Sequence, residues 1–216
     1  MLKRVIIFDF DGTIADSLSA LVTIANNLAL EFGYPQVDEE EILRLSKLSS
    51  SDIVQQSPVP FHKIPFVLRR IKKELNKNIA DLQPFAGMVR ALVSLKEEGY
   101  ILGIITSNLE ENVCQFLHNN DLQSCFDFIY SGTTLFGKHK IINKAIKKHN
   151  LQSKDIIYVG DETRDIEAAQ KSKIKVIAVT WGFNSPLVLA KYEPDFMVTK
   201  PEELTNILIH KTLKVI

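Results

Sequence analysis

Short apolar runs alternate with amphipathic helical patterns from residue 88 to the end of the chain. The runs that predict strands cover residues 100–105, 126–130, 156–159, 176–180 and 196–199. The patterns that predict helices cover residues 88–99, 110–119, 138–149, 163–172 and a last stretch from Pro201. Strands that are separated by helices predict an α/β fold, because a helical crossover joins parallel strands and packs on the sheet. We therefore expect a Rossmann-like, doubly wound parallel sheet with helices on both faces.

A further strand is expected near the start of the chain, and two aspartates follow it. Val5–Phe8 is apolar throughout, as in a strand that is buried on both faces. Asp9 and Asp11 come next, and the two-residue period of a strand would place both side chains on one side. They follow the carboxyl end of the strand, where open α/β sheets bind ligands. Two carboxylates this close repel each other, so we expect a divalent cation here; a solvated Asp-Gly turn is the alternative.

The stretch between these aspartates and residue 84 has helical patterns and no convincing strand. Helices are expected at residues 16–32, from Asp38 onward, after a serine-rich turn, and at residues 66–75. Ser51 or Asp52 is the predicted N-cap of the helix after the turn, because both side chains can accept from a helical N–H group.

These patterns predict two domains. Residues 1–16 and 84–216 would form the α/β core, and residues 17–83 an all-helical cap domain inserted into it. Because the insertion directly follows the two aspartates, we expect a lid that excludes water and selects the substrate. A satellite bundle that only packs against the core is the alternative.

Composition and charge exclude several classes of partner. The 26 Lys and Arg residues equal the 26 Asp and Glu residues, so no net charge attracts nucleic acid or an acidic membrane. The basic run at residues 69–73 is followed by Glu74 and is interpreted as a solvated helix face. No segment reaches the roughly 18 apolar residues that a transmembrane helix needs. We expect neither a nucleic acid nor a membrane as partner.

Two cysteines, Cys114 and Cys125, are too few for a disulfide framework and are interpreted as reduced thiols. The N-terminal apolar stretch is interrupted by Asp9 before it reaches the length of a secretory signal. Both observations predict a cytoplasmic protein.

Further polar residues follow the predicted strands. They are Thr106, Ser107 and Asn108 after one strand, Gly160 and Asp161 with Asp165 after another, and Lys138 after a loop. Taken singly, such residues are more often helix caps, turns or solvated lysines. The carboxyl ends of parallel strands lie along one edge of a sheet, however, so these residues are expected to converge with Asp9 and Asp11. A nucleophilic carboxylate with hydroxyl donors, a cation and further acids suits phosphoryl transfer.

The chain resembles the haloacid dehalogenase superfamily, in its phosphatase branch. The stretch Asp9-Phe10-Asp11-Gly12-Thr13 is similar to the first motif of that family, and Thr106 to the second. Lys138 is similar to the third-motif lysine, and the stretch Gly160-Asp161-Glu162-Thr163-Arg164-Asp165 to the acidic fourth motif. The resemblance covers the whole chain, includes a helical cap between the first two motifs, and is greatest to phosphoglycolate phosphatases and related phosphomonoesterases.

The resemblance implies a Mg²⁺-dependent phosphatase that hydrolyses a small phosphomonoester, phosphoglycolate-like or a sugar phosphate. Asp9 would attack phosphorus and form an aspartyl-phosphate, and Asp11 would serve as the acid and then the base. Thr106, helped by the main-chain N–H groups of Ser107 and Asn108, would bind the phosphoryl oxygens. Lys138 would neutralise charge and keep Asp9 ionised.

The resemblance also implies a metal site built from oxygen ligands, which suit Mg²⁺. The Asp9 carboxylate, the main-chain carbonyl of Asp11 and the Asp161 carboxylate would bind the ion. Asp165 lies one helical turn beyond Asp161 and is either a further ligand or a group that orients the ligands; we favour the second.

A competing motif lies at residues 132–139, which nearly spell the nucleotide-binding P-loop. His139 stands where a Ser or Thr would hold the metal ion, so we reject nucleotide binding. The same stretch departs from the family pattern, in which proline follows the third-motif lysine. Lys140 is therefore the alternative to Lys138.

Other functions share these residues. A phosphomutase of the beta-phosphoglucomutase type uses the same core, and the sequence does not separate it from a phosphatase. A catalytically silent phosphate-binding protein is a second alternative, against which the intact acids argue. Within the cap, the polar loop 46–52 with Lys47 is the predicted substrate contact. The expected partner is a small phosphorylated metabolite, and the oligomeric state, monomer or dimer, stays open.

Overall fold

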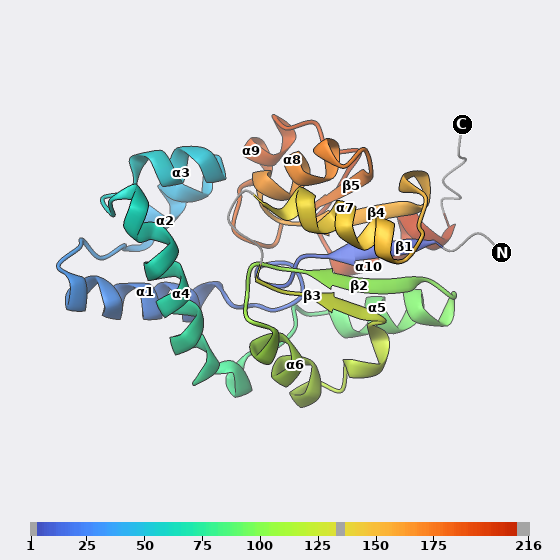
Figure 1. The fold of residues 1–216 in the computed structure, drawn as a ribbon, viewed down its shortest axis with the longest axis horizontal. Coiled ribbons are helices and arrows are strands. Elements are labelled where there is room, and N and C mark those ends of the chain that lie inside the picture. Colours follow the sequence, from blue (N-terminus) through green and yellow to red (C-terminus); the bar gives the residue numbers. More distant parts are fainter. Residues whose placement is uncertain (1–3, 133–136, 211–216) are drawn as a thin grey trace.

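A parallel sheet with the strand order β3-β2-β1-β4-β5-β6 organises the chain. The computed structural model describes residues 4–132 and 137–210 (Figure 1). The strands are β1 (Val5–Phe8), β2 (Ile101–Ile105), β3 (Phe128–Tyr130), β4 (Ile156–Gly160), β5 (Lys175–Val179) and β6 (Phe196–Val198). β1 lies between β2 and β4, with Phe8 opposite Ile104 on one side and Val159 on the other. The strand order reverses at β1, so its carboxyl end is the switch point at which such sheets bind ligands.

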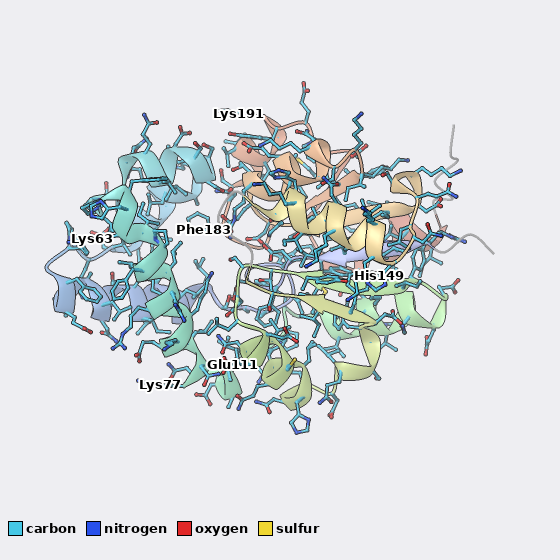
Figure 2. The ribbon with its side chains drawn as sticks, viewed as in Figure 1. Lys63, Lys77, Glu111, His149, Phe183 and Lys191 are labelled. Carbon is cyan, nitrogen blue, oxygen red and sulfur yellow. The ribbon has the colours of Figure 1, made fainter. Side chains whose placement is uncertain are left out.

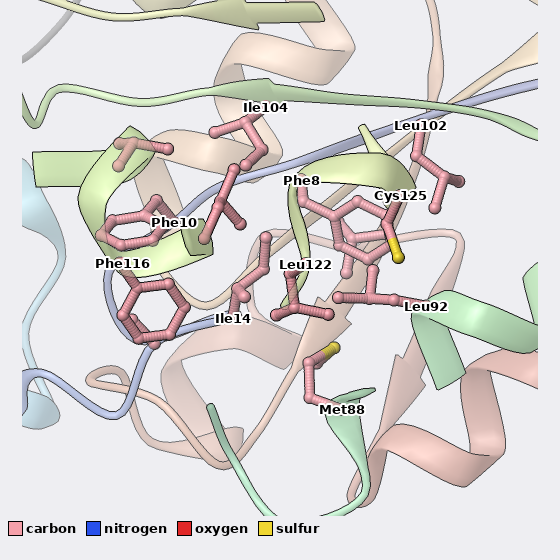
Figure 3. Packing of buried hydrophobic residues seen from close by; sticks show 14 of the residues in the cluster. Phe8, Phe10, Ile14, Met88, Leu92, Leu102, Ile104, Phe116, Leu122 and Cys125 are labelled. Carbon is pink, nitrogen blue, oxygen red and sulfur yellow. The ribbon is translucent and has the colours of Figure 1, made fainter. Parts of the chain in front are cut away.

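The side chains of β1 alternate between two hydrophobic cores, one on each face of the sheet. Ile6 and Phe8 belong to the larger core, part of which is shown in Figure 3, and Val5 and Ile7 to the smaller one. Each of these side chains is at most 1% exposed. Burial of such a side chain contributes about 1.5–3 kcal/mol, which explains why the run is apolar throughout.

Helices cover both faces. They are α5 (Met88–Glu97), α6 (Glu110–Asn119), α7 (Lys138–Lys148), α8 (Thr163–Lys171), α9 (Pro186–Ala190) and α10 (Pro201–Thr205), and a π-helical turn, Asn206–His210, follows the last. The α/β prediction is confirmed. The short helix α9 was not predicted; Pro186 stands at its first position, where the fixed φ angle of proline suits a helix start. No helix in the described residues has the length and apolar character needed to cross a membrane.

The segment between β1 and α5, residues 17–83, is helical and is called the insert below. Its α-helices are α1 (Leu18–Phe32), α2 (Glu39–Ser46), α3 (Ser50–Gln56) and α4 (Ile64–Asn76). Figure 1 shows the insert beside the end of the sheet at which β1 leads toward α1. The two connections to the core run side by side, because Asp16 N donates to Gln83 O at 3.0 Å.

One predicted helix start in the insert was wrong. The N-cap of α3 is Ser49 rather than Ser51 or Asp52, and its Oγ accepts from the main-chain N–H of Asp52 at 3.1 Å. The helix therefore begins two or three residues earlier than predicted, since any of the consecutive serines has the side chain that a cap requires.

Candidate active site

The ammonium group of Lys138 joins two buried aspartates beyond the end of β1. Its Nζ donates to Asp9 Oδ2 at 2.6 Å and to Asp165 Oδ1 at 2.5 Å. Lys138 is the first residue of α7, and all three residues are at most 2% exposed. Burial alone would lower the pKa of Lys138, but the carboxylates of Asp165 and Asp9 outweigh it and raise this pKa, so the lysine stays charged. Lys140, the alternative, is exposed.

Two hydrogen-bond donors fix the carboxylate of Asp161, the third buried aspartate of the site. Thr13 Oγ1 donates to its Oδ1 at 2.8 Å, and the main-chain N–H of Phe183 donates to its Oδ2 at 2.8 Å. Figure 2 shows Phe183 on the side of the core that faces the insert. Burial raises the pKa of Asp161 well above its ordinary value, and the neighbouring carboxylates of Glu162 and Asp165 raise it further.

Three carboxylates converge closely enough to bind one cation. A ligand oxygen from each of Asp9, Asp161 and Asp165 lies within 4.8 Å of the others. Lys138 supplies one positive charge to this cluster of buried acids, which leaves an excess of negative charge. Oxygen donors in excess over cations suit a hard divalent ion such as Mg²⁺. The residues present therefore fit a magnesium site.

Glycines make room for the cluster. A Cβ atom added to Gly182 would lie 2.4 Å from Asp161 Oδ2 and 2.4 Å from the carbonyl oxygen of Gly12. A Cβ atom added to Gly160 would lie 2.4 Å from Asp165 Oδ2. Backbone therefore approaches both carboxylates at distances that no other residue type permits.

Asp165 also holds the start of α8. Its Oδ2 accepts from the main-chain N–H of Glu162 at 3.1 Å, which forms one half of a capping box. Burial raises the pKa of Asp165 to about 6, although Lys138 opposes this shift. Both predicted roles, ligand and orienting group, stay compatible with this position.

Asp11 has different partners from Asp9. Its carboxylate accepts from Asn108 Nδ2 at 2.9 and 3.2 Å and from Ser17 Oγ at 2.9 Å. Burial raises the pKa of Asp11 to about 6, and the negative charge of Asp9 contributes to the shift. The two-residue period of a strand predicts that the side chains of Asp9 and Asp11 point to the same side. This period does not apply to them, because β1 ends at Phe8.

The residues after β2, Thr106 to Asn108, lie beside Asp11, but the main-chain N–H of Asn108 has a different partner from the predicted one. Thr106 is buried, and its Oγ1 accepts from the main-chain N–H of Asn108 at 3.0 Å. The Asn108 N–H group predicted to bind a phosphoryl oxygen is thus already bonded, because the chain turns tightly after β2. The Thr106 hydroxyl keeps its own proton to donate. The Ser107 carbonyl oxygen accepts from Lys72 Nζ.

The prediction that the basic run at residues 69–73 is a solvated helix face is wrong at Lys72. This residue of α4 is partly buried at the site rather than solvated. Burial lowers its pKa, as does the positive charge of Arg164, while Asp11 and Asp9 raise it. Lys72 lies three residues before the fully buried Leu75, a spacing that could have identified it as inward-facing.

Lys47, the predicted substrate contact, is exposed at the end of α2. Within the described part of the chain, no hydrogen bond or ion pair joins its side chain to the acidic cluster. The assignment of Lys47 as a substrate contact stays a prediction. In the P-loop-like stretch, residues 133–136 lie outside the described residues.

The loop 46–52 touches the core through its backbone and Ser50 instead. Ser50 N donates to Thr163 Oγ1 at 3.0 Å, and Ser50 Oγ donates to Glu162 Oε2 at 3.2 Å. From the core, Asn184 Nδ2 donates to the carbonyl oxygens of Ser46 and Leu48, at 3.3 and 3.0 Å. The insert thus rests against the start of α8, next to the acidic cluster.

Comparisons with known proteins agree with this geometry. Residues 6–179 match the profile of the family described as "Haloacid dehalogenase-like hydrolase". A "Phosphoglycolate phosphatase" of Synechococcus elongatus is 36% identical over 201 residues, which cover 93% of this chain and 95% of the relative. One of Vibrio cholerae is 26% identical, over 90% of this chain and 92% of the relative. The crystal structure of a predicted phosphatase from Clostridium acetobutylicum superposes on this chain with a TM-score of 0.82, at 24% sequence identity. The superposition covers 97% of this chain and 100% of the other, so the two share the fold. The chain belongs to the haloacid dehalogenase-like hydrolases and is a phosphatase of that family.

Proposed function

We propose that the protein is a Mg²⁺-dependent phosphatase that hydrolyses a small phosphomonoester through a phosphorylated Asp9. The observation that carries this proposal is that two neighbouring aspartates, the buried Asp9 and the partly buried Asp11, have different hydrogen-bond partners. Asp9 forms an ion pair with Lys138, whereas Asp11 accepts hydrogen bonds from the neutral donors Asn108 and Ser17, and burial raises its pKa to about 6. The first chemical step requires a carboxylate nucleophile beside a second carboxyl group that can carry a proton to the leaving group.

In the first step, an Oδ atom of Asp9 forms a bond to phosphorus while the bond from phosphorus to the substrate's alcohol oxygen breaks. Asp11 donates its proton to that oxygen, so a neutral alcohol leaves. In the second step, water attacks phosphorus and gives its proton to Asp11, while the bond to Asp9 breaks. Inorganic phosphate is released, and both aspartates return to their initial protonation states.

The chain's other residues hold the reacting groups in place. The Thr106 hydroxyl donates a hydrogen bond to a phosphoryl oxygen, and Lys138 pairs with the Asp9 carboxylate and holds it in place. Asp9, Asp161 and the main-chain carbonyl of Asp11 are the proposed ligands of Mg²⁺, with Asp165 beside them. When bound, the ion neutralises negative charge on the transferring phosphoryl group.

Phosphoglycolate is the first substrate to test, because the relatives from Synechococcus elongatus and Vibrio cholerae both carry it in their names. The insert is proposed to act as a lid, since it contacts α8 beside the acidic cluster. The domain division at residues 17–83 and the cytoplasmic location stay predictions.

The test is release of inorganic phosphate from a panel of small phosphomonoesters, with Mg²⁺ and with a chelator. We expect turnover only with the metal ion, and none in Asp9→Asn. Asp81→Asn, at an exposed aspartate, is the matched control and should keep wild-type activity. Turnover that survives Asp9→Asn would contradict the assignment, and an isomerised sugar phosphate without phosphate release would indicate a mutase.

A further inference from the structure

Two cations at the site have no role in the chemistry described so far. Lys72 comes from α4 of the insert and Arg164 from α8 of the core. Lys138 differs from both, because two carboxylates pair with it, whereas Arg164 has one such partner and Lys72 has none among the described residues. The positions of Lys72 and Arg164 therefore call for a separate explanation.

Lys72 is fixed at the edge of the phosphoryl site. Its Nζ donates to the carbonyl oxygen of Ser107, the residue after Thr106, and no carboxylate pairs with it among the described residues. Its own carbonyl oxygen accepts from Asn112 Nδ2 at 2.9 Å, which holds α4 against α6. The ammonium group is thus delivered to the site by a docked helix.

Arg164 is the second residue of α8 and directly precedes Asp165. Its Nη2 is paired with Glu162, but its Nε is buried and has no hydrogen-bond partner in the described part of the structure. A guanidinium stays protonated in proteins, so Arg164 is a fixed positive charge. A buried N–H group without a partner is destabilising, and an incoming acceptor would offset that cost.

We propose that Lys72 and Arg164 form a subsite for a carboxylate on the substrate, and that the substrate class is a small phosphorylated hydroxy acid. This inference rests on the proposed phosphatase function. Two like charges that approach each other are stabilised by an anion between them, and a guanidinium matches the planar carboxylate.

The contacts of Lys72 also limit the size of the substrate. Lys72 bonds the residue next to Thr106, so the carboxylate and the phosphoryl group are expected to lie one or two carbon atoms apart. One cation comes from the insert and the other from the core, so a bound carboxylate would also hold the two together.

The test compares phosphoglycolate with 2-hydroxyethyl phosphate, in which a neutral hydroxymethyl group replaces the carboxylate. The measured quantity is the ratio of kcat/KM for the two substrates. A charged hydrogen bond contributes about 1.5–3 kcal/mol, so Lys72→Met and Arg164→Gln should each lower this ratio by about 10- to 100-fold. The exposed neighbour Lys73 provides the control, Lys73→Met, which should keep the wild-type ratio.

An unchanged ratio in both variants, or an equal loss on both substrates, would overturn the subsite. Calorimetric titration of phosphoglycolate into Asp9→Asn and into Asp9→Asn with Lys72→Met separates this proposal from the catalytic one. Binding that needs Lys72 in a protein without phosphatase activity would leave the subsite standing and remove the proposed function. If the wild type turns phosphoglycolate over but binding does not depend on Lys72, the proposed function would stand and the subsite would be overturned.

A separate observation is a chain of buried amides that links the insert to Asp11. Asn76 Nδ2 of α4 donates to Asn112 Oδ1 at 2.8 Å, and Asn112 Nδ2 donates to Asn108 Oδ1 at 2.8 Å. Asn108 Nδ2 then donates to both oxygens of Asp11. Asn108 and Asn112 are fully buried, so water does not compete for these hydrogen bonds and each amide orients the next.

We infer that Asn112 is a positioning residue, which orients Asp11 through Asn108 when α4 is docked. Asn112→Ala should lower kcat/KM for phosphoglycolate about tenfold or more, because a misplaced acid protonates the alcohol poorly. An aryl phosphate whose leaving group departs without a proton should lose much less. Asn119→Ala, at an exposed position of the same helix, is the control. Equal losses on both substrates would show a merely structural role and overturn the inference.

Discussion

The Nζ atom of Lys138 lies 2.6 Å from Oδ2 of Asp9, although 129 residues separate the two in the chain. β1 ends one residue before Asp9, and α7 begins at Lys138. The pair therefore depends on the sheet and on the start of one helix. Both side chains are about 3% exposed, so the ion pair is shielded from water.

Replacing Lys138 should damage both stability and activity. Lys138→Met leaves the carboxylates of Asp9 and Asp165 buried without their cation, and the loss of one partner of such a pair costs about 3–5 kcal/mol. We expect a lower free energy of unfolding in denaturant titrations and no measurable turnover. Lys140→Met, at an exposed position two residues on, should be neutral in both assays; equal effects of the two substitutions would contradict the assignment.

Asp11→Asn should separate acid–base chemistry from metal binding. The variant keeps the main-chain carbonyl of residue 11 but cannot give or take a proton, so kcat/KM for phosphoglycolate should fall by about 10²- to 10⁴-fold. Calorimetric Mg²⁺ affinity should change little. Loss of Mg²⁺ binding with an intact fold would show that the side chain itself ligates the ion.

The metal site can be followed by the one tryptophan of the chain. Trp181 Nε1 donates to the carbonyl oxygen of Thr13 at 3.1 Å, and Thr13 in turn donates to Asp161. We therefore expect Mg²⁺ to change the tryptophan fluorescence of the wild type but not of Asp161→Asn. An equal response of the two proteins would place the ion elsewhere.

Gly182→Ala should weaken the same response. The added Cβ would lie 2.4 Å from Asp161 Oδ2 and from the Gly12 carbonyl oxygen, and neither neighbour can withdraw freely. Mg²⁺ affinity should therefore fall at least about tenfold, or 1.4 kcal/mol. Gly33→Ala is the control, because it strains a positive φ angle of 72° at the end of α1 but has open space around it.

Asn184 should control how firmly the insert is held. Its Nδ2 donates to the carbonyl oxygens of Ser46 and Leu48, and its Oδ1 accepts from Thr163 N at 2.9 Å. Asn184→Ala should raise KM and speed amide hydrogen exchange in residues 46–52. Unchanged exchange in this loop would show that other contacts keep the insert in place.

The sheet and the acidic cluster could be predicted because both depend on local patterns. An apolar run such as Val5–Phe8 predicts a buried strand by itself, and strand ends in a parallel sheet share an edge. Asp9 and Asp161 converge for that reason, and Lys138 joins them from the first position of α7.

The contacts that cross between the insert and the core could not be predicted in the same way. Lys72 stands in a basic run whose sequence also suits a solvated face, and only the docking of α4 on α6 turns it inward. No sequence motif marks Asn112 or Asn184 as buried, because asparagine is also common on protein surfaces. Residues of this kind gain their roles from the tertiary fold.

Covalent phosphorylation of Asp9 is the central step of the proposed reaction. The direct measurement is mass spectrometry of protein that is quenched with acid during turnover of phosphoglycolate with Mg²⁺. We predict one phosphoryl group on the peptide that contains Asp9, enriched in Asp11→Asn because hydrolysis is slowed, and absent from Asp9→Asn. Turnover without a phosphoryl group on any residue, or with the group on a residue other than Asp9, would contradict the account.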